Sequence, residues 1–138
     1  MSDQVKKSRP EFRNISKIND LFQKYKWPPA SMVSLVHRAS GMVLFGLLPV
    51  ILYILDQSLI SEGSFQHFQY LLSGWFVKLI LLAIAWGYLQ HFCSGIRHLI
   101  MDLHIGLDKV SARKSAIGVL AFASGLTALI ALKLFGAF

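Results

Sequence analysis

The chain has 138 residues, of which 54% are hydrophobic and only 15% are charged. Soluble domains contain about 45–50% apolar and about 25% charged residues, so this composition excludes a disordered chain and disfavours a soluble globule. The net charge is +7, and half of the Lys and Arg residues precede residue 27, so the positive charge belongs mainly to an N-terminal tail. We therefore expect a small, single-domain membrane protein.

The N-terminal tail, residues 1–30, precedes the apolar part of the chain. Residues 1–26 mix charges of both signs without a long apolar run, as is typical of a surface segment. Trp27, Pro28 and Pro29 follow, and the prolines end any preceding helix because proline lacks an amide donor and restricts the residue before it. We expect a new helix to begin just after them, with Ser31 as its N-cap.

Three apolar segments follow within residues 31–138, the predicted membrane domain. They cover about residues 31–55, 70–101 and 116–132. Each is close to the roughly 20 residues that a helix needs to cross the hydrocarbon core of a bilayer. The alternative is a buried bundle in a soluble protein, but so short a chain leaves almost no polar surface to cover three such helices. The predicted fold is therefore all-α and integral to the membrane, with three transmembrane helices.

The charges between these segments predict their orientation. The first loop, residues 56–69, contains Asp56 and Glu62 and no Lys or Arg, whereas the second loop, about residues 102–115, contains three basic residues. The tail carries seven Lys and Arg residues. Under the positive-inside rule, the tail and the second loop lie on the cytoplasmic side, and the first loop and the C-terminus lie outside.

Ionisable residues inside the segments are the candidates for function, because a charged side chain at the centre of a transmembrane helix costs about 2.5–3.5 kcal/mol. Lys78 and Lys133 lie toward the outer ends of the second and third segments. Their long side chains can extend to the interface, so neither lysine requires a functional explanation.

The first segment carries a polar stripe. It consists of Ser34, His37, Arg38 and Gly41, which fall at i, i+3, i+4 and i+7 and therefore share one face of a helix near the cytoplasmic side. A hydroxyl, an imidazole and a guanidinium on one stripe predict a polar pocket that opens from the inner surface. The alternative is that Arg38 simply extends to the interface.

The second segment places His91 between Gly87 and Gly95, one helical turn on each side. His91 lies about 15 Å from the inner end of the segment, near the midplane of the membrane. Such a flat surface around one imidazole could admit a macrocycle whose iron the histidine ligates. The alternative is that the glycines serve close helix packing and His91 makes an interhelical hydrogen bond. His37 is expected nearer the inner edge, so a second axial histidine would have to come from a partner.

Few other residues of the chain are candidates for function. Asp102 and His104, at the inner mouth of the bundle, are candidates for a proton path, although a plain surface role is the alternative. The single cysteine, Cys93, excludes a disulfide framework or a CxxC metal site within this chain. No HExxH motif, Walker loop or nucleophile constellation is present, so we expect no catalysis by this chain alone.

Two motifs and a short element of the tail carry a resemblance to a known family. They are Ser34-Leu-Val-His-Arg-Ala-Ser-Gly41, His91-Phe-Cys-Ser-Gly-Ile-Arg-His-Leu-Ile-Met-Asp102 and, in the tail, Arg9-Pro10. Together with the three-span layout they resemble the cytochrome b membrane-anchor subunit of succinate dehydrogenase, over nearly the whole chain from Arg9. The two patterns are jointly quite specific.

The resemblance implies a role for each motif residue. His91 would be an axial ligand of haem b, with the other ligand supplied by a second, smaller anchor subunit. His37 and Arg38 would lie at the haem propionates, and Ser34 and Arg38 would belong to the ubiquinone site. The implied complex sits in a bacterial inner membrane, where a flavoprotein subunit and an iron–sulfur subunit pass electrons from succinate to ubiquinone.

Two other interpretations remain open at this point. One is the anchor of a fumarate reductase, because the direction of electron flow depends on quinone and cofactor potentials that the sequence does not encode. The other is a small transporter or structural membrane subunit in which His91 and Arg38 form a proton relay. A b-type absorption spectrum is expected only for the electron-transfer interpretations.

Overall fold

The part of the protein that the computed structural model describes, residues 27–136, consists of helices joined by short connections. Its four helices are α2 (Pro29–Leu59), α3 (Glu62–Ser73), α4 (Trp75–Asp102) and α5 (Lys109–Leu134), and no strand occurs within this range. Three of them, α2, α4 and α5, are long and apolar enough to cross a membrane. The predicted all-α membrane fold with three spanning helices is confirmed. Residues 1–26 of the predicted tail lie outside the described residues.

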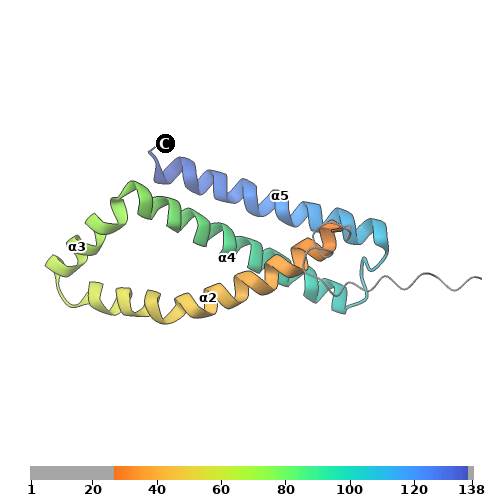
Figure 1. Cartoon of the computed structure of the whole chain (residues 1–138), viewed down its shortest axis with the longest axis horizontal. Helices are drawn as coiled ribbons and strands as arrows, with labels where there is room; N and C mark the ends of the chain where they lie inside the picture. Colours follow the sequence, from red (N-terminus) through yellow and green to blue (C-terminus); the bar gives the residue numbers. More distant parts are fainter. Residues whose placement is uncertain (1–26, 137–138) are drawn as a thin grey trace, which may run out of the picture.

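The three long helices lie along the long axis of the molecule, and successive ones run in opposite directions (Figure 1). The start of α2, the end of α4 and the start of α5 meet at one end of the bundle, which we call the Asp108 end after the residue that precedes α5. The short helix α3 connects α2 to α4 at the opposite end, which we call the α3 end. Helix α4 packs against both α2 and α5.

Helix α2 begins at Pro29, earlier than the sequence predicts. Pro28 occupies the N-cap position and makes no side-chain cap hydrogen bond, so the expectation that Ser31 caps this helix is wrong. The physical reason is that a proline in the first turn needs no amide partner and already has a helical φ, so the helix can start at the proline itself. Ser31 lies instead within the first turn.

The segment predicted as the first loop contains helix α3, which the sequence analysis missed. Ser61 caps it reciprocally with Ser64: the Ser61 hydroxyl accepts from the Ser64 amide at 3.1 Å, and the Ser61 amide donates to the Ser64 hydroxyl at 3.1 Å. Such a capping box stabilises a helix start even where the sequence is polar. Tyr70, the predicted start of the second span, belongs to α3, and Gly74 separates α3 from α4.

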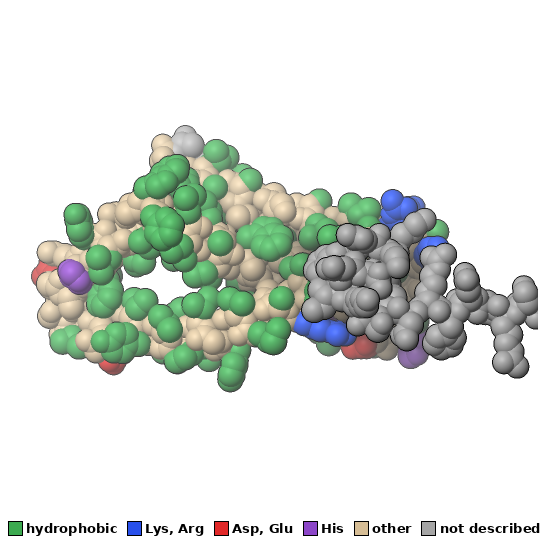
Figure 2. All heavy atoms as spheres, in the orientation of Figure 1, with side chains coloured by type: hydrophobic (Ala, Val, Ile, Leu, Met, Phe, Trp, Pro, Cys, Tyr) green, Lys and Arg blue, Asp and Glu red, His purple; other side chains and the backbone are tan. Residues whose placement is uncertain are grey.

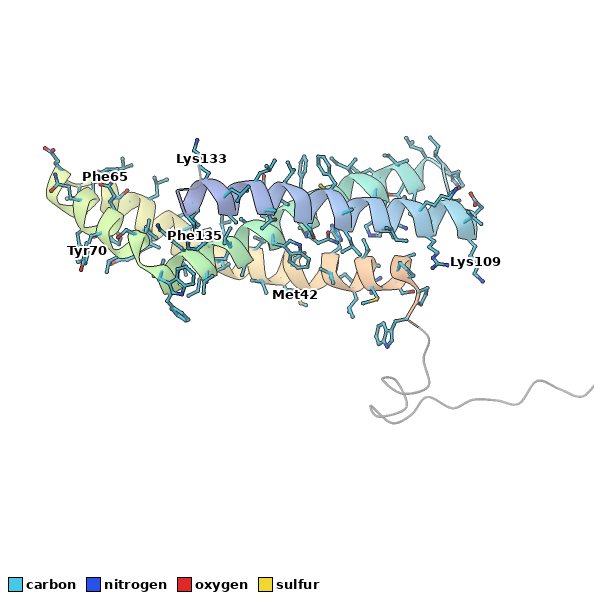
Figure 3. All side chains as sticks on the ribbon, turned by 90° about the horizontal axis from the view of Figure 1, so that it is seen from above. Met42, Phe65, Tyr70, Lys109, Lys133 and Phe135 are labelled. Carbon is cyan, nitrogen blue, oxygen red and sulfur yellow. The ribbon has the colours of Figure 1, made fainter. Side chains whose placement is uncertain are left out.

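Few side chains are fully enclosed by the bundle. Within residues 27–136, the buried apolar residues are Val33, Ala116 and Ala123, and the buried polar residues are Gln90, Ser94 and Arg97, all three on α4. Most of the large apolar side chains are exposed, and they cover much of the visible face in Figure 2. Met42, 72% exposed, projects from α2 in Figure 3. An apolar exterior is what a lipid environment requires of a spanning bundle.

Polar contacts join α4 to α5. Arg97 is 5% exposed, and it donates from Nε to the Ser115 hydroxyl at 3.0 Å and from Nη2 to the Ala112 carbonyl at 3.2 Å. Nearer the α3 end, Trp86 Nε1 donates to the Ser124 hydroxyl at 3.2 Å. Hydrogen bonds between helices in a membrane hold neighbouring spans in register, because lipid offers no competing partner.

Helix α5 starts at the Asp108 end with a side-chain cap. The Asp108 carboxylate accepts from the Ser111 amide at 2.9 Å, and hydrogen bonds from Ser111 lower the pKa of Asp108 below its ordinary value. The basic residues Lys109, Arg113 and Lys114, predicted to lie in the second loop, therefore belong to the first turns of α5. Figure 3 shows Lys109 and Lys133 at opposite ends of this helix.

A groove of about 760 Å³ lies at the α3 end. Its lining is mostly apolar and comes from all four helices, and it includes both Lys78 and Lys133. The Lys78 amino group lies 5.6 Å from the centroid of the Phe135 ring. Figure 2 shows the molecule hollowed between α2 and α4 at this end.

Candidate functional site

Three histidines from two helices meet where α2 crosses α4. The rings of His37 and His91 stack with their centroids 4.2 Å apart and their planes at 9°. The ring of His98 lies 5.1 Å from that of His37, tilted by 52°. The sequence predicted the individual helix faces, but it gave no indication that the three imidazoles would be neighbours.

His37 and His91 lie at similar depths in the bundle, with His37 nearer the Asp108 end. His37 lies eight residues into α2 and His91 lies eleven residues before the end of α4. At 1.5 Å per residue these positions are about 12 Å and about 17 Å from the Asp108 end. His37 therefore starts nearer the Asp108 end than His91, as expected, and the two side chains bring their rings to within 4.2 Å of each other.

The ring of His91 is anchored to the backbone of α2. Its Nδ1 lies 3.0 Å from the carbonyl oxygen of His37 and 3.3 Å from the hydroxyl of Ser40. A carbonyl oxygen can only accept, so Nδ1 carries the proton and donates it to His37. The other ring nitrogen, Nε2, then presents its lone pair, which is the form that binds a metal.

Gly41 allows this close approach of the ring to α2. A Cβ atom at Gly41 would lie 2.9 Å from Cε1 of His91, closer than real Cβ contacts allow, whereas one at Gly95 would lie 3.6 Å from Nε2 of His37. A Cβ atom at Gly87 would meet nothing within 4 Å. The glycine that makes room for His91 is therefore Gly41 on the facing helix, and the flat surface that Gly87 and Gly95 would offer to a macrocycle stays a prediction.

An apolar cavity of about 230 Å³ lies between α2 and α4 on the side of His91 that faces the α3 end. Ser40 and Gly87 contribute to its wall, and its other lining residues are Val43, Leu44, Leu47, Ile80, Ala83 and Ile84. His91 itself is not among the residues that line this cavity.

A second pocket, of about 430 Å³, lies at the Asp108 end between α2 and α4. Ser34 and Arg38 line it from α2, as the sequence predicts for a polar pocket on this face. Arg97 and His98 line it from α4, and neither was assigned a role in the sequence analysis. With Ser31, which also lines it, the pocket offers two hydroxyls, two guanidinium groups and an imidazole to a small ligand.

Asp102 and His104 lie beyond this pocket. Both are exposed, and neither is among its lining residues. Asp102 is the last residue of α4, and His104 follows in the turn with a φ of 62°, a backbone conformation that side chains rarely adopt. Their part in a proton path stays a prediction.

The described residues contain no group of three His, Cys, Asp or Glu side chains that could hold a metal ion without help. A haem needs fewer protein ligands than a bare metal ion, because its macrocycle supplies most of the nitrogens that bind the iron. A single histidine with a free Nε2 would therefore be enough from this chain. The stacked rings of His37 and His91 lie side by side, so they do not approach an iron from opposite faces.

Comparison with known proteins identifies the family. The family model described as succinate dehydrogenase/fumarate reductase transmembrane subunit matches residues 9–130. A succinate dehydrogenase cytochrome b556 subunit of Coxiella burnetii is 39% identical over 98 residues, which cover 70% of this chain and 78% of the relative. The protein of the same name from Paracoccus denitrificans is 29% identical over 99 residues, covering 72% and 76%.

The same resemblance extends to a third bacterial relative. The succinate dehydrogenase cytochrome b556 subunit of Rickettsia prowazekii is 32% identical over 84 residues, which cover 61% of this chain and 64% of the relative. These matches, together with three apolar spanning helices, confirm the predicted multi-pass protein of a bacterial inner membrane. The chain belongs to the succinate dehydrogenase/fumarate reductase transmembrane subunit family, as its two sequence motifs predicted.

Proposed function

We propose that this membrane anchor of succinate dehydrogenase supplies, through His91, one axial ligand of a haem b shared with a second, smaller anchor subunit. The observation that carries the proposal is the hydrogen bond from Nδ1 of His91 to the His37 carbonyl, at 3.0 Å. That bond leaves Nε2 as the metal-binding nitrogen. The relatives are named cytochromes, which supports a haem in this chain as well.

His37 and Arg38 would hold the haem propionates. The His37 ring contacts that of His91, and Arg38 follows it in the chain on the exposed side of α2. Arg38 is permanently charged and can donate two parallel hydrogen bonds to a carboxylate. When bound, the haem provides a one-electron carrier within the bundle.

The pocket at the Asp108 end fits the head group of ubiquinone. A quinone is neutral, and its two carbonyl oxygens accept hydrogen bonds. Ser34 can donate its hydroxyl to one of them, and Arg38 lines the same pocket with permanent donors. Reduction of the quinone takes two electrons, delivered by the iron–sulfur subunit, and two protons. Asp102 and His104, which are exposed beyond the pocket, would pass those protons inward from water.

Membership of this family favours an electron-transfer anchor over the small transporter or structural subunit with a proton relay. The family description covers both succinate dehydrogenases and fumarate reductases. The names of the relatives favour succinate oxidation as the physiological direction, with flavoprotein and iron–sulfur subunits as partners.

A reduced-minus-oxidised absorption spectrum of the purified complex tests the proposal. We expect the bands of a low-spin b-type haem, together with reduction of ubiquinone by succinate. A complex that transfers electrons from succinate to ubiquinone without any b-type band would overturn the haem assignment. A complex that shows neither b-type bands nor reduction of ubiquinone by succinate would favour the transporter or structural interpretation instead.

A further inference from the structure

We propose that Ser40 is a positioning residue for His91: its hydroxyl and the His37 carbonyl, both on α2, together hold the Nδ1–H of the histidine. This inference rests on the proposed haem ligation by His91 and extends it from the ligand itself to the group that orients and tunes that ligand.

Three atoms form a closed triangle at the contact of α2 with α4. The Ser40 hydroxyl donates to the His37 carbonyl at 2.9 Å, Nδ1 of His91 lies 3.0 Å from the same carbonyl, and Nδ1 lies 3.3 Å from the Ser40 oxygen. The hydroxyl has one hydrogen, which the carbonyl takes, so its lone pairs are left to face the Nδ1–H. Two acceptors therefore share the proton of His91.

The shared proton has two consequences for the ring. Two acceptors on neighbouring turns of one rigid helix fix the rotation of the imidazole as well as its tautomer. Acceptors at Nδ1–H also increase electron density on the ring, which makes Nε2 a stronger donor to iron. A stronger donor stabilises the more positive oxidised iron, so the arrangement lowers the midpoint potential of the haem.

Ser40 is the member of the triangle that substitution can remove, since the other acceptor is a backbone carbonyl. The chain also contains a matched control on the same helix. Ser58 donates to the Leu55 carbonyl at 2.8 Å, which is the same i to i−3 bond that Ser40 makes, but it lies near the α3 end, away from His91. Replacing Ser58 removes the helix bond without touching His91.

The test is a redox titration of the haem in the purified complex with Ser40→Ala, Ser40→Thr and Ser58→Ala. We expect Ser40→Ala to raise the midpoint potential and to shift the low-spin electron paramagnetic resonance signal, because the axial ligand becomes a weaker donor and is held less firmly. Ser40→Thr keeps a hydroxyl that can bond the same carbonyl, and it should restore both readouts. Ser58→Ala should leave them at their wild-type values.

If the Ser40→Ala complex does not retain haem, Ser40→Cys takes its place, because a thiol is a weaker partner of nearly the same size. A midpoint potential and a resonance signal equal to those of the wild type in the haem-loaded Ala or Cys variant would overturn the role of Ser40. The haem assignment itself fails separately, when His91→Leu leaves the haem spectrum unchanged.

Discussion

At the scale of single residues, the site depends on contacts between helices more than on residue type alone. The sequence places Ser34, His37 and Arg38 on one face of α2, and the structure lines one pocket with Ser34 and Arg38. The stacking of His37 on His91 was not predictable, because it depends on how far α2 is shifted along α4. Ser40 could have been found, since it follows His37 by three residues and so shares its face.

Ser34→Ala tests the quinone pocket. Loss of one neutral hydrogen bond is worth about 0.5–1.5 kcal/mol, so we expect a quinone affinity about 2- to 12-fold weaker. Arg38→Leu removes a charge as well and should reduce activity further. The measurement is the ratio of ubiquinone reduction to succinate oxidation with an upstream artificial acceptor. A ratio equal to that of the wild type in both variants would exclude these residues from the quinone site.

Gly41→Ala tests the close approach of His91 to α2. The added methyl group would lie 2.9 Å from Cε1 of His91, so the ring must move away from the acceptors that hold it. We expect a reduced haem content and an altered low-spin spectrum. Gly46→Ala is the control on the same helix, because its methyl group would meet nothing within 4 Å. Equal haem content in the two variants would contradict the predicted contact.

At the scale of the helices, hydropathy predicts which segments form spanning helices better than it predicts how those helices pack against one another. The three apolar segments predict α2, α4 and α5, but nearly every face of each is apolar, so periodicity does not reveal which side packs inward. The burial of Gln90, Ser94 and Arg97 on α4 was therefore missed. Helix α3 was missed because its sequence is short and mixed, although Ser61 and Ser64 supply the start signal.

Asp108→Ala tests the cap of α5. Asp108 accepts from the Ser111 amide, and three basic residues in the following turns sit unfavourably at the positive end of the helix dipole. We expect a lower unfolding temperature, whereas Asp108→Ser, another good N-cap, should keep most of the stability. Equal unfolding temperatures for the Ala and Ser variants would contradict the cap.

The same cap has a defined pH dependence. Hydrogen bonds from Ser111 lower the pKa of Asp108 in the folded protein, so the stabilisation is present above the unfolded value of 3.8 and is lost as the pH falls through the folded pKa. The difference in unfolding temperature between wild type and Asp108→Ala should therefore stay constant across neutral pH and shrink in acid.

At the scale of the whole molecule, the distribution of charge predicts the orientation in the membrane. In Figure 2, Lys and Arg side chains of the visible face gather at the Asp108 end. The positive-inside rule then puts that end, with its pocket, on the cytoplasmic side. The exposed apolar surface of the three spanning helices is available to lipid and, under the proposed function, to a second anchor subunit.

Single cysteines test this orientation in a Cys93→Ser background. Glu62→Cys lies on α3 and Lys109→Cys lies at the start of α5, and both positions are exposed. With an impermeant reagent applied from outside intact cells, we expect labelling of the residue-62 site and none of the residue-109 site. Labelling of the residue-109 site from outside would reverse the predicted orientation.

The measurement that tests the central claim most directly is the haem spectrum and haem content of His91→Leu in the assembled complex. Leucine cannot bind iron, so we predict loss of the low-spin b-type bands, while His67→Leu, at an exposed position on α3, retains them in full. A His91→Leu complex with the haem content and spectrum of the wild type would contradict the account.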